Sequence, residues 1–312
     1  MYRPKVADTD LREARTPAQV ALALETGGYL PDEGLATAVL LALRMQRPLF
    51  LEGEPGVGKT EVARTIAKAM GAELLRLQCH EGIDAAQAVY EWDYSRQILH
   101  LRAAEAAGGS LDARELEDDL FTERYLVRRP LLAALDNDLD VPPVLLIDEI
   151  DRSDDEFEAF LLEALADYSV TVPEVGTFTA RRPPVVVLTS NRTRDVHDAL
   201  KRRCLYHWVE HPDLEREVRI ISMRAPRVPA ELARQVASLT QRFRQLGLYK
   251  PPGVAESIDW AVALDALDTA AVTADAVGST LGAVLKYRED QQRVQEAGLD
   301  GIVAEALAGA GT

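Results

Sequence analysis

Residues 53–60 read Gly-Glu-Pro-Gly-Val-Gly-Lys-Thr and match the phosphate-loop pattern G-x-x-x-x-G-K-[ST]. The apolar residues 49–51 before them predict a short strand, and residues 60–70 after them predict a helix that stops at Gly71. Glycines let such a loop curl until its backbone N–H groups face a phosphate, and the following helix adds its positive N-terminus. The stretch therefore predicts a nucleotide-binding domain of the α/β class.

Two side chains in this stretch have defined chemical tasks. Lys59 is placed to reach the β- and γ-phosphates as a mobile point charge, and the hydroxyl of Thr60 is placed to ligate Mg²⁺. We therefore expect a nucleoside triphosphate and Mg²⁺ as cofactors. The candidate nucleotide-binding residues are Gly53, Glu54, Pro55, Gly56, Val57, Gly58, Lys59, Thr60 and Glu61.

After a strand predicted at 73–79, a buried third strand is predicted at 142–149, and it ends in the acid pair Asp148 and Glu149. Acids at the carboxyl end of a parallel strand lie where ligands bind in this architecture. We expect Asp148 to hold Mg²⁺ and Glu149 to act as the general base that orients the attacking water. The alternative is an acidic surface turn, because more acids follow. Asp151 among them is expected to be a helix cap or a solvated acid.

Polar residues also lie next to the two strands predicted after this one. Asn191 follows an apolar run, where its amide can contact the γ-phosphate or the water; a strand-terminal turn residue is the alternative. Lys201, Arg202 and Arg203 precede another strand. One of the two arginines could stabilise transition-state charge in a neighbouring subunit of a ring. A solvated basic run at a helix C-terminus is an equal alternative.

The order of the elements predicts the fold class. Strands alternate with helices, which favours a parallel sheet with crossover helices. We expect a three-layer α/β/α core with five parallel strands, followed by an all-α lid domain. We expect an N-terminal helix and linker at 1–30, the core at 31–212 and the lid at 213–312. Within the core we expect an insert at 91–101 and a hairpin at 169–180.

Composition narrows the class of partner. The chain has 312 residues and a net charge of −16, which repels nucleic-acid phosphates and anionic membranes. We therefore expect protein partners, although the charge could serve only to keep the protein in solution. Cys79 and Cys204 lack metal spacing and are expected to be reduced core residues. Without a signal-peptide pattern or a run of 18 apolar residues, we expect a cytoplasmic protein with no membrane insertion.

The motifs GEPGVGKT, VLLIDEID, TSN and ALKRRC, in this order, resemble the AAA+ superfamily. Longer stretches resemble its MoxR branch, and within it the subgroup found beside von Willebrand A-domain proteins, which includes CoxD-type ATPases. The resemblance covers about residues 25–290, and the stretches that carry the finer match are 77–99, 157–177, 189–208 and 285–290.

This resemblance assigns roles to the candidates. It makes Lys59 and Thr60 the Walker A residues, the acid pair Walker B, and Asn191 the sensor asparagine. It makes Arg202 and Arg203 the candidate arginine fingers, with Arg203 preferred because it directly precedes the strand. It also implies ATP as the nucleotide, ATP hydrolysis, a hexameric ring, and the insert and hairpin at the ring pore.

Within the insert, Trp92 and Tyr94 are either client contacts or packing residues. Tyr29 and Leu30 either border the adenine or pack in the core. One departure concerns the lid, where the family often carries a sensor-2 arginine. Ala255 stands at that position here, so another lid residue such as Arg288 serves, or the contact is missing.

The expected function is that of a motor or chaperone ATPase that helps to mature a partner metalloenzyme, with a von Willebrand A-domain protein as a second partner. The alternatives are a nucleotide-gated protein-binding switch with little turnover and a DNA-acting AAA+ motor. The acidic net charge argues against the DNA-acting motor.

Overall fold

The computed structural model describes residues 10–106, 119–269 and 271–310. The chain divides into two compact units, each of which is described by itself. Unit 1 comprises Met1–Ala23, Glu33–Glu52 and Ala63–His207; unit 2 comprises Leu24–Asp32, Gly53–Val62 and Trp208–Thr312. The predicted domain boundaries stay predictions, and residues 1–9 of the expected N-terminal segment lie outside the described residues.

A five-stranded sheet forms the centre of unit 1, in the order β2-β5-β8-β1-β9. The pairings β2–β5, β5–β8 and β8–β1 are parallel. The strands span Leu49–Glu52 (β1), Leu74–Gln78 (β2), Val144–Asp148 (β5), Val185–Ser190 (β8) and Leu205–Trp208 (β9). The predicted fold class is confirmed. The buried, apolar strands β1, β5 and β8 require helices on both faces of the sheet.

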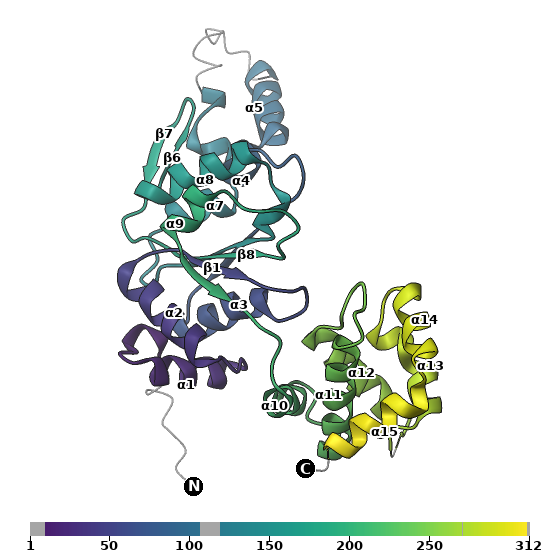
Figure 1. The fold of residues 1–312 in the computed structure, drawn as a ribbon. Coiled ribbons are helices and arrows are strands. Elements are labelled where there is room, and N and C mark those ends of the chain that lie inside the picture. Colours follow the sequence, from purple (N-terminus) through teal and green to yellow (C-terminus); the bar gives the residue numbers. More distant parts are fainter. Residues whose placement is uncertain (1–9, 107–118, 270, 311–312) are drawn as a thin grey trace. The chain divides into compact units, whose positions relative to one another are not determined.

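Helices cover both faces of the sheet, and Figure 1 shows α2 and α3 on one face with α4, α7, α8 and α9 on the other. The second face carries a buried cluster to which Leu145 and Ile147 of β5 and Phe157 and Leu161 of α8 belong. The helices associated with the sheet are α1 (Pro17–Gly27), α2 (Glu33–Met45), α3 (Lys59–Met70), α4 (Ala85–Val89), α7 (Pro130–Leu135), α8 (Asp155–Asp167) and α9 (Asp198–Arg203).

The predicted hairpin is present: β6 (Ser169–Val172) pairs antiparallel with β7 (Gly176–Thr179). The segment around 91–101 differs from both arrangements that its sequence allowed, a continuous helix or a local hairpin. Tyr90–Trp92 (β3) pairs instead with the distant Leu126–Arg128 (β4), and α5 (Tyr94–Ala106) follows β3. A pairing partner more than thirty residues away leaves no local sequence signal.

The two aromatic residues of the insert have different surroundings. Trp92 is buried and packs edge-to-face against Tyr90 and Phe121, with ring centroids 5.8 and 5.3 Å away. It is therefore a packing residue. Tyr94 is 61% exposed.

The C-terminal part of unit 2 is all helical, as expected of a lid. Its helices pack around an apolar cluster that includes Phe243 and Trp260, whose rings stack with centroids 5.6 Å apart. The helices are α10 (Leu214–Arg224), α11 (Ala230–Arg244), α12 (Val254–Ala266), α13 (Ala274–Val284), α14 (Arg288–Glu296) and α15 (Leu299–Ala310). Among the described helices of the chain, none is long and apolar enough to cross a membrane.

Candidate functional site

The phosphate loop has the backbone that its glycines predict. Gly56 and Gly58 have φ angles of +78° and +96°, in the left-handed region that side chains disfavour. Lys59 begins α3, is 6% exposed, and donates from Nζ to the carbonyl oxygens of Gly53 and Glu54, each at 2.7 Å. The lysine thus lies within the curl of the loop, where a point charge can contact bound phosphates.

A lid segment touches this loop directly. The N–H of Val254 donates to the carbonyl of Gly56 at 3.0 Å. A Cβ placed on Gly253 would lie 2.7 Å from the Cα of Gly56, closer than real side chains approach. Both positions therefore need glycine, because backbone packs on backbone there. This contact lies wholly within unit 2.

Loop and lid residues of unit 2 also enclose a cavity of about 190 Å³. Tyr29 and Leu30 are both buried and both line this cavity. They can therefore pack in the protein and also contact a bound base, the two roles that the sequence left open. Burial raises the pKa of Tyr29 to about 12, which keeps its phenol neutral. Apolar residues of α10 and α12 also line the cavity, namely Ile220, Met223, Val254 and Ile258. A small cavity with apolar walls beside a phosphate loop suits a purine base and its sugar.

The cations of this cavity come from α10 rather than α12. Arg216 donates from Nε and a terminal nitrogen to the carbonyl of Leu30, at 3.1 and 2.7 Å. Arg224 donates to Glu61 at 2.9 Å. Ala255 lines the cavity without a charge, and Arg288 is not among the described residues that line it. Arg216 could not be predicted, because in the sequence α10 is distant from the segment in which a sensor arginine is usually sought.

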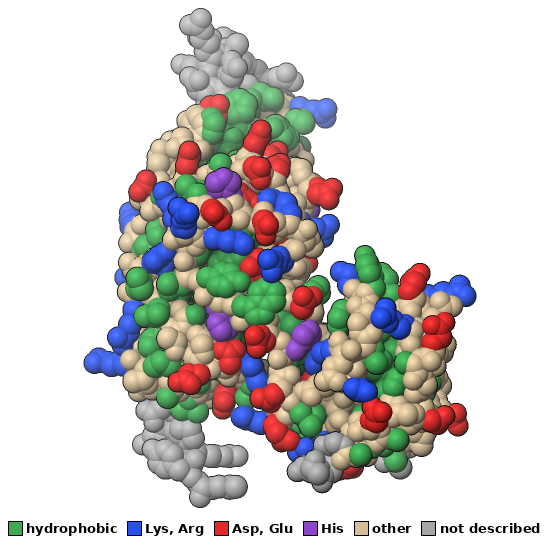
Figure 2. Space-filling model, in the orientation of Figure 1, with side chains coloured by type: hydrophobic (Ala, Val, Ile, Leu, Met, Phe, Trp, Pro, Cys, Tyr) green, Lys and Arg blue, Asp and Glu red, His purple; other side chains and the backbone are tan. Residues whose placement is uncertain are grey.

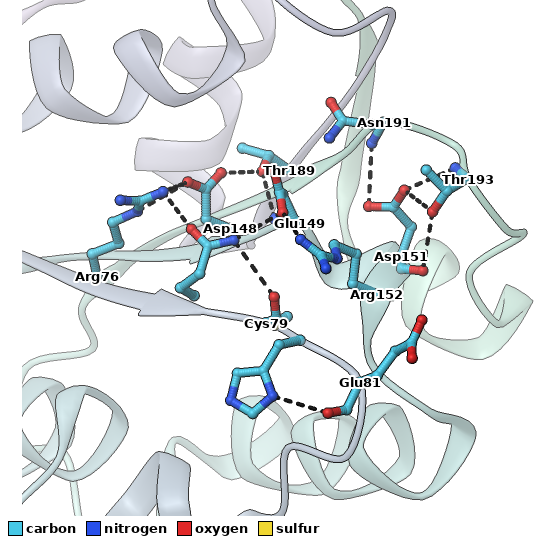
Figure 3. Close-up of polar contacts among 12 residues, drawn as sticks. Arg76, Cys79, Glu81, Asp148, Glu149, Asp151, Arg152, Thr189, Asn191 and Thr193 are labelled. Atoms are coloured by element: carbon cyan, nitrogen blue, oxygen red, sulfur yellow. Dashed lines mark hydrogen bonds and ion pairs between the residues drawn. The ribbon is translucent and has the colours of Figure 1, made fainter.

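The acid pair lies at the carboxyl end of β5 in unit 1 (Figure 3). Asp148 is 3% exposed, and its Oδ1 accepts from the hydroxyl of Thr189 at 2.5 Å. The same hydroxyl accepts from the N–H of Glu149 at 3.0 Å. Glu149 itself has a left-handed backbone, with φ +56°. An acidic residue in this conformation stores strain, which is typical of functional sites.

Two residues of β2 contact the acids, and neither was predicted from the sequence. Arg76 donates to Asp148 Oδ2 from Nε at 3.0 Å and from a terminal nitrogen at 2.5 Å. Gln78 donates from Nε2 to Glu149 Oε2 at 3.0 Å. In the strand register Gln78 lies directly opposite Asp148. The available signal was the polar alternation of residues 76 and 78 within a strand of an otherwise apolar sheet.

Asp151 is neither a helix cap nor a solvated acid, so that expectation was wrong. It is 2% exposed and accepts from the N–H of Asn191 at 3.2 Å and the N–H of Thr193 at 2.8 Å. It also accepts from the Thr193 hydroxyl at 2.7 Å. These bonds hold the loop after β8, because a buried carboxylate needs such donors. Among the described residues, the side-chain amide of Asn191 has no hydrogen-bond partner, so it is available to a ligand.

The two candidate finger arginines differ in their contacts. Arg203 donates to the carbonyl of Leu162 in α8 at 3.1 Å. Arg47 donates to the backbone carbonyls of both arginines and so fixes the end of α9. The Arg202 side chain makes no hydrogen bond or ion pair within the part of the chain that the structure describes. The contacts thus leave Arg202 the freer of the two.

The chemistry of the acids fits Mg²⁺. Among the described residues, no group of three or more His, Cys, Asp or Glu could hold a metal alone. Mg²⁺ in phosphoryl-transfer sites takes one or two protein oxygens and completes its shell with phosphate and water, so a single buried aspartate suits it. Burial, together with the nearby charges of Asp148, Asp151 and Glu149, raises the pKa of the Cys79 thiol to about 12. That thiol therefore stays protonated and does not act as a nucleophile.

The chain was compared with known protein families and proteins. Residues 48–204, half of the chain, match the family described as AAA domain (dynein-related subfamily). A segment of 49 residues is 45% identical to midasin from Giardia intestinalis, and it spans 16% of this chain and 1% of midasin.

The chain is also similar to solved structures of two bacterial proteins. A mutant of RuvB from Thermotoga maritima has 16% identity and a TM-score of 0.47, over 86% of this chain and 72% of that one. A Cytophaga hutchinsonii protein, described provisionally as an ATPase, has 15% identity and a TM-score of 0.48, over 94% and 93% of the two chains. The match over residues 48–204 contains the phosphate loop, the acid pair and Asn191, and we conclude that the chain belongs to the AAA domain family, dynein-related subfamily.

Proposed function

We propose that this chain binds and hydrolyses MgATP and uses the cycle to remodel a partner protein. Membership of the AAA family carries nucleotide binding, usually with Mg²⁺, and ATPase activity at the family level. The remodelling role, the partner and the assembly are our inferences from this chain's residues.

In this proposal the phosphate loop, Gly53 to Thr60 with Glu61, holds the triphosphate. Lys59 neutralises phosphate charge, and Thr60 and Asp148 offer oxygens to the metal. Bound Mg²⁺ supplies charge stabilisation for the leaving and transferred phosphates. Glu149 takes the proton of the attacking water, and Asn191 orients that water. The parallel sheet supports this division of roles, since β1, β5 and β8 end at one edge and the loop follows β1.

The cavity in unit 2 is the observation that carries the remodelling role. Its wall combines phosphate-loop residues with residues of α10 and α12, and Gly253 packs on Gly56. A nucleotide seated there would contact both the loop and the lid helices, so that binding and release would change the packing of the lid. Such closure and opening is a common way to convert a ligand cycle into motion.

We further propose that the chain acts beside a von Willebrand A-domain protein in the maturation of a metalloenzyme, as a MoxR-type ATPase of the CoxD-like subgroup. The support is the resemblance of residues 77–99 and 189–208 to that subgroup. The exposed Tyr94, on the helix that follows β3, is the candidate client contact in the insert. The proposed partners are not inferred from midasin or RuvB, because the similarity to midasin is short and the similarity to RuvB is remote.

A homo-oligomeric ring, in which one arginine of α9 reaches the neighbouring subunit's nucleotide, completes the proposal. Arg203 is preferred by its place in the sequence and Arg202 by its freedom from contacts. Mixing Lys59→Ala subunits with Arg203→Ala or Arg202→Ala subunits separates them. Only the finger variant should restore activity in the mixture, and no restoration with either would contradict catalysis across subunits.

Steady-state ATP hydrolysis tests the central proposal. Wild type should turn over ATP in Mg²⁺, Glu149→Gln should bind ATP but lose about 100-fold or more of kcat, and Lys59→Ala should lose binding. Turnover of Glu149→Gln at the wild-type rate would show that Glu149 is not the base. Binding without turnover in wild type, even with the partner present, would favour a nucleotide-gated switch instead.

Surface charge weighs against the DNA-acting alternative. Figure 2 shows acidic and basic side chains intermixed on the drawn face of each unit. With a net charge of −16, this pattern provides little attraction for a phosphate backbone. DNA binding that weakens steeply with salt in a gel-shift assay would revive that alternative.

A further inference from the structure

The two acids at the end of β5 are joined by a chain of contacts through β2 (Figure 3). Arg76 holds Asp148 Oδ2 through two nitrogens, and one of those nitrogens also donates to Gln78 Oε1. Gln78 then donates from Nε2 to Glu149. The main-chain bond between Asp148 and Glu149 closes the ring. No residue of the ring other than the acids had a role in the proposed reaction.

The chemistry of the donors fixes the direction of every contact. A guanidinium has only donors, so Gln78 must present its amide oxygen to Arg76. Its amide nitrogen is thereby turned toward the Glu149 carboxylate, which only accepts. Arg76 therefore sets which way the Gln78 amide faces, and that amide shares Glu149 Oε2 with Arg152, which donates to the same oxygen at 3.2 Å. A lysine could not do this in the same way, because it lacks the planar fork that spans two acceptors.

Exposure makes the Arg76 contact exchangeable. The Asp148 side chain is 4% exposed, whereas the Arg76 side chain is 46% exposed. An arginine this exposed can move off the carboxylate and keep its donation to Gln78, while the buried aspartate cannot move. Asp148 Oδ1 is held by the Thr189 hydroxyl, and Oδ2 is held by Arg76. A divalent cation that bound Asp148 would meet the positive charge of Arg76 at this carboxylate.

We propose that Arg76 is a positioning residue that occupies the Asp148 carboxylate in competition with Mg²⁺ and, through Gln78, aligns Glu149. The inference rests on the proposed ATPase function and deepens it. Removal of Arg76 should therefore have two opposite effects. Mg²⁺ should bind more tightly, because the competing positive charge is gone. ATP hydrolysis should be slower, because Glu149 is no longer aligned. A residue that only stabilised the fold would weaken both or neither.

The test measures metal binding apart from turnover. A non-hydrolysable ATP analogue is titrated by calorimetry at a series of Mg²⁺ concentrations, and kcat is measured separately. For Arg76→Met, the half-saturating Mg²⁺ concentration should fall about fivefold or more, because a unit positive charge has left the carboxylate. Its kcat at saturating Mg²⁺ should fall about tenfold, because Glu149 is no longer aligned.

Two further variants separate charge from geometry. Arg76→Lys keeps the charge and loses the fork, so its Mg²⁺ midpoint should stay within about twofold of wild type while kcat falls as in Arg76→Met. Arg181→Met removes the same charge from a side chain that is 85% exposed, and it should change neither quantity. If Arg76→Met does not fold, Arg76→Gln provides the neutral variant, with the same expectation for the midpoint.

An unchanged or raised half-saturating Mg²⁺ concentration in the neutral variants would overturn the proposed competition with Mg²⁺. A wild-type kcat in Arg76→Lys would overturn the proposed alignment of Glu149. Failure of wild type to bind the analogue in Mg²⁺ would instead overturn the proposed ATPase function. The two failures are therefore distinguished within one set of measurements.

Discussion

Two buried carboxylates, one in each unit, have similar partners, but the partner arginines differ in their exposure to solvent. Glu217 in the lid is fully buried and accepts two bonds from Arg244, at 2.7 and 2.8 Å, and one from the Ser257 hydroxyl at 2.6 Å. Asp148 in the core is likewise held by an arginine and a hydroxyl, those of Arg76 and Thr189. Each acid therefore has charge and hydrogen bonds to offset its burial.

The difference lies in the arginines. The side chain of Arg244 is 10% exposed and also donates to the carbonyl of Pro252, whereas that of Arg76 is 46% exposed. A closed pair of this kind fixes the packing of the lid helices and the approach to Gly253. An open pair can exchange its cation. Burial of the partner, rather than burial of the acid, thus separates a structural carboxylate from one that can serve a reaction.

The matched change of acid to amide should have its largest effect at the core position. Asp148→Asn should lower kcat by at least about 100-fold, because a neutral amide is a poor ligand for Mg²⁺. Stability in denaturant should change by less than about 1 kcal/mol, since the partner arginine is exposed. A large loss of stability with normal turnover would place Asp148 among the structural acids and break the comparison.

The same change in the lid should do the reverse. Glu217→Gln leaves Arg244 buried without a counter-charge and should cost about 3–5 kcal/mol in free energy of unfolding. Chemical denaturation followed by fluorescence of the buried Trp260 reports this loss. Ser257→Ala serves as the milder control, at about 1 kcal/mol for one hydrogen bond. Wild-type stability for Glu217→Gln would show that the lid pair is as exchangeable as the core pair.

Acid should weaken the lid through a neighbouring group. Burial, together with the positive charges of Arg244 and Lys59, lowers the pKa of His211 to about 4. The unfolded chain binds the proton near pH 6.5 and the folded chain only near pH 4, so stability falls as pH drops between these values. After allowance for partial exposure, the loss is about 1–2 kcal/mol. His211→Gln should flatten this part of the pH profile of unfolding; an unchanged slope would contradict the assignment.

An exposed pair marks the lower end of the scale. Arg181 and Asp138 lie 3.3 Å apart with both side chains more than 80% exposed. Asp138→Asn should change the free energy of unfolding by less than about 0.5 kcal/mol, because solvent screens the pair. Thermal unfolding at low and high salt provides the measurement. A clear salt-dependent loss would mean that exposure alone does not rank the pairs of this protein.

The local motifs of the fold could be predicted from sequence because each depends on neighbouring residues. The glycines of 53–58 require a curled loop, and the apolar run before Asp148 requires a buried strand with acids at its end. The hairpin around Pro173 and Gly176 was predicted for the same reason. The strand pairing of Tyr90–Trp92 was not, because its partner is at 126–128.

The contacts of the acids could not be predicted, because they depend on strand order. Arg76 and Asp148 are 72 positions apart in sequence and meet only because β2 lies beside β5. Asp151 illustrates the same limit: its partners Asn191 and Thr193 come from the loop after β8, the strand on the other side of β5. The chemical types of these residues indicated a functional site, but they did not predict which residues contact each other.

By itself, the sequence determined the α/β class, the curled loop with Lys59 inside it, and the acids at the end of a buried strand, since backbone freedom and apolar runs act over a few residues. Only the tertiary structure decided which cation holds each acid and whether solvent can reach that cation. Those properties follow from strand register and packing between distant segments, which no local pattern records.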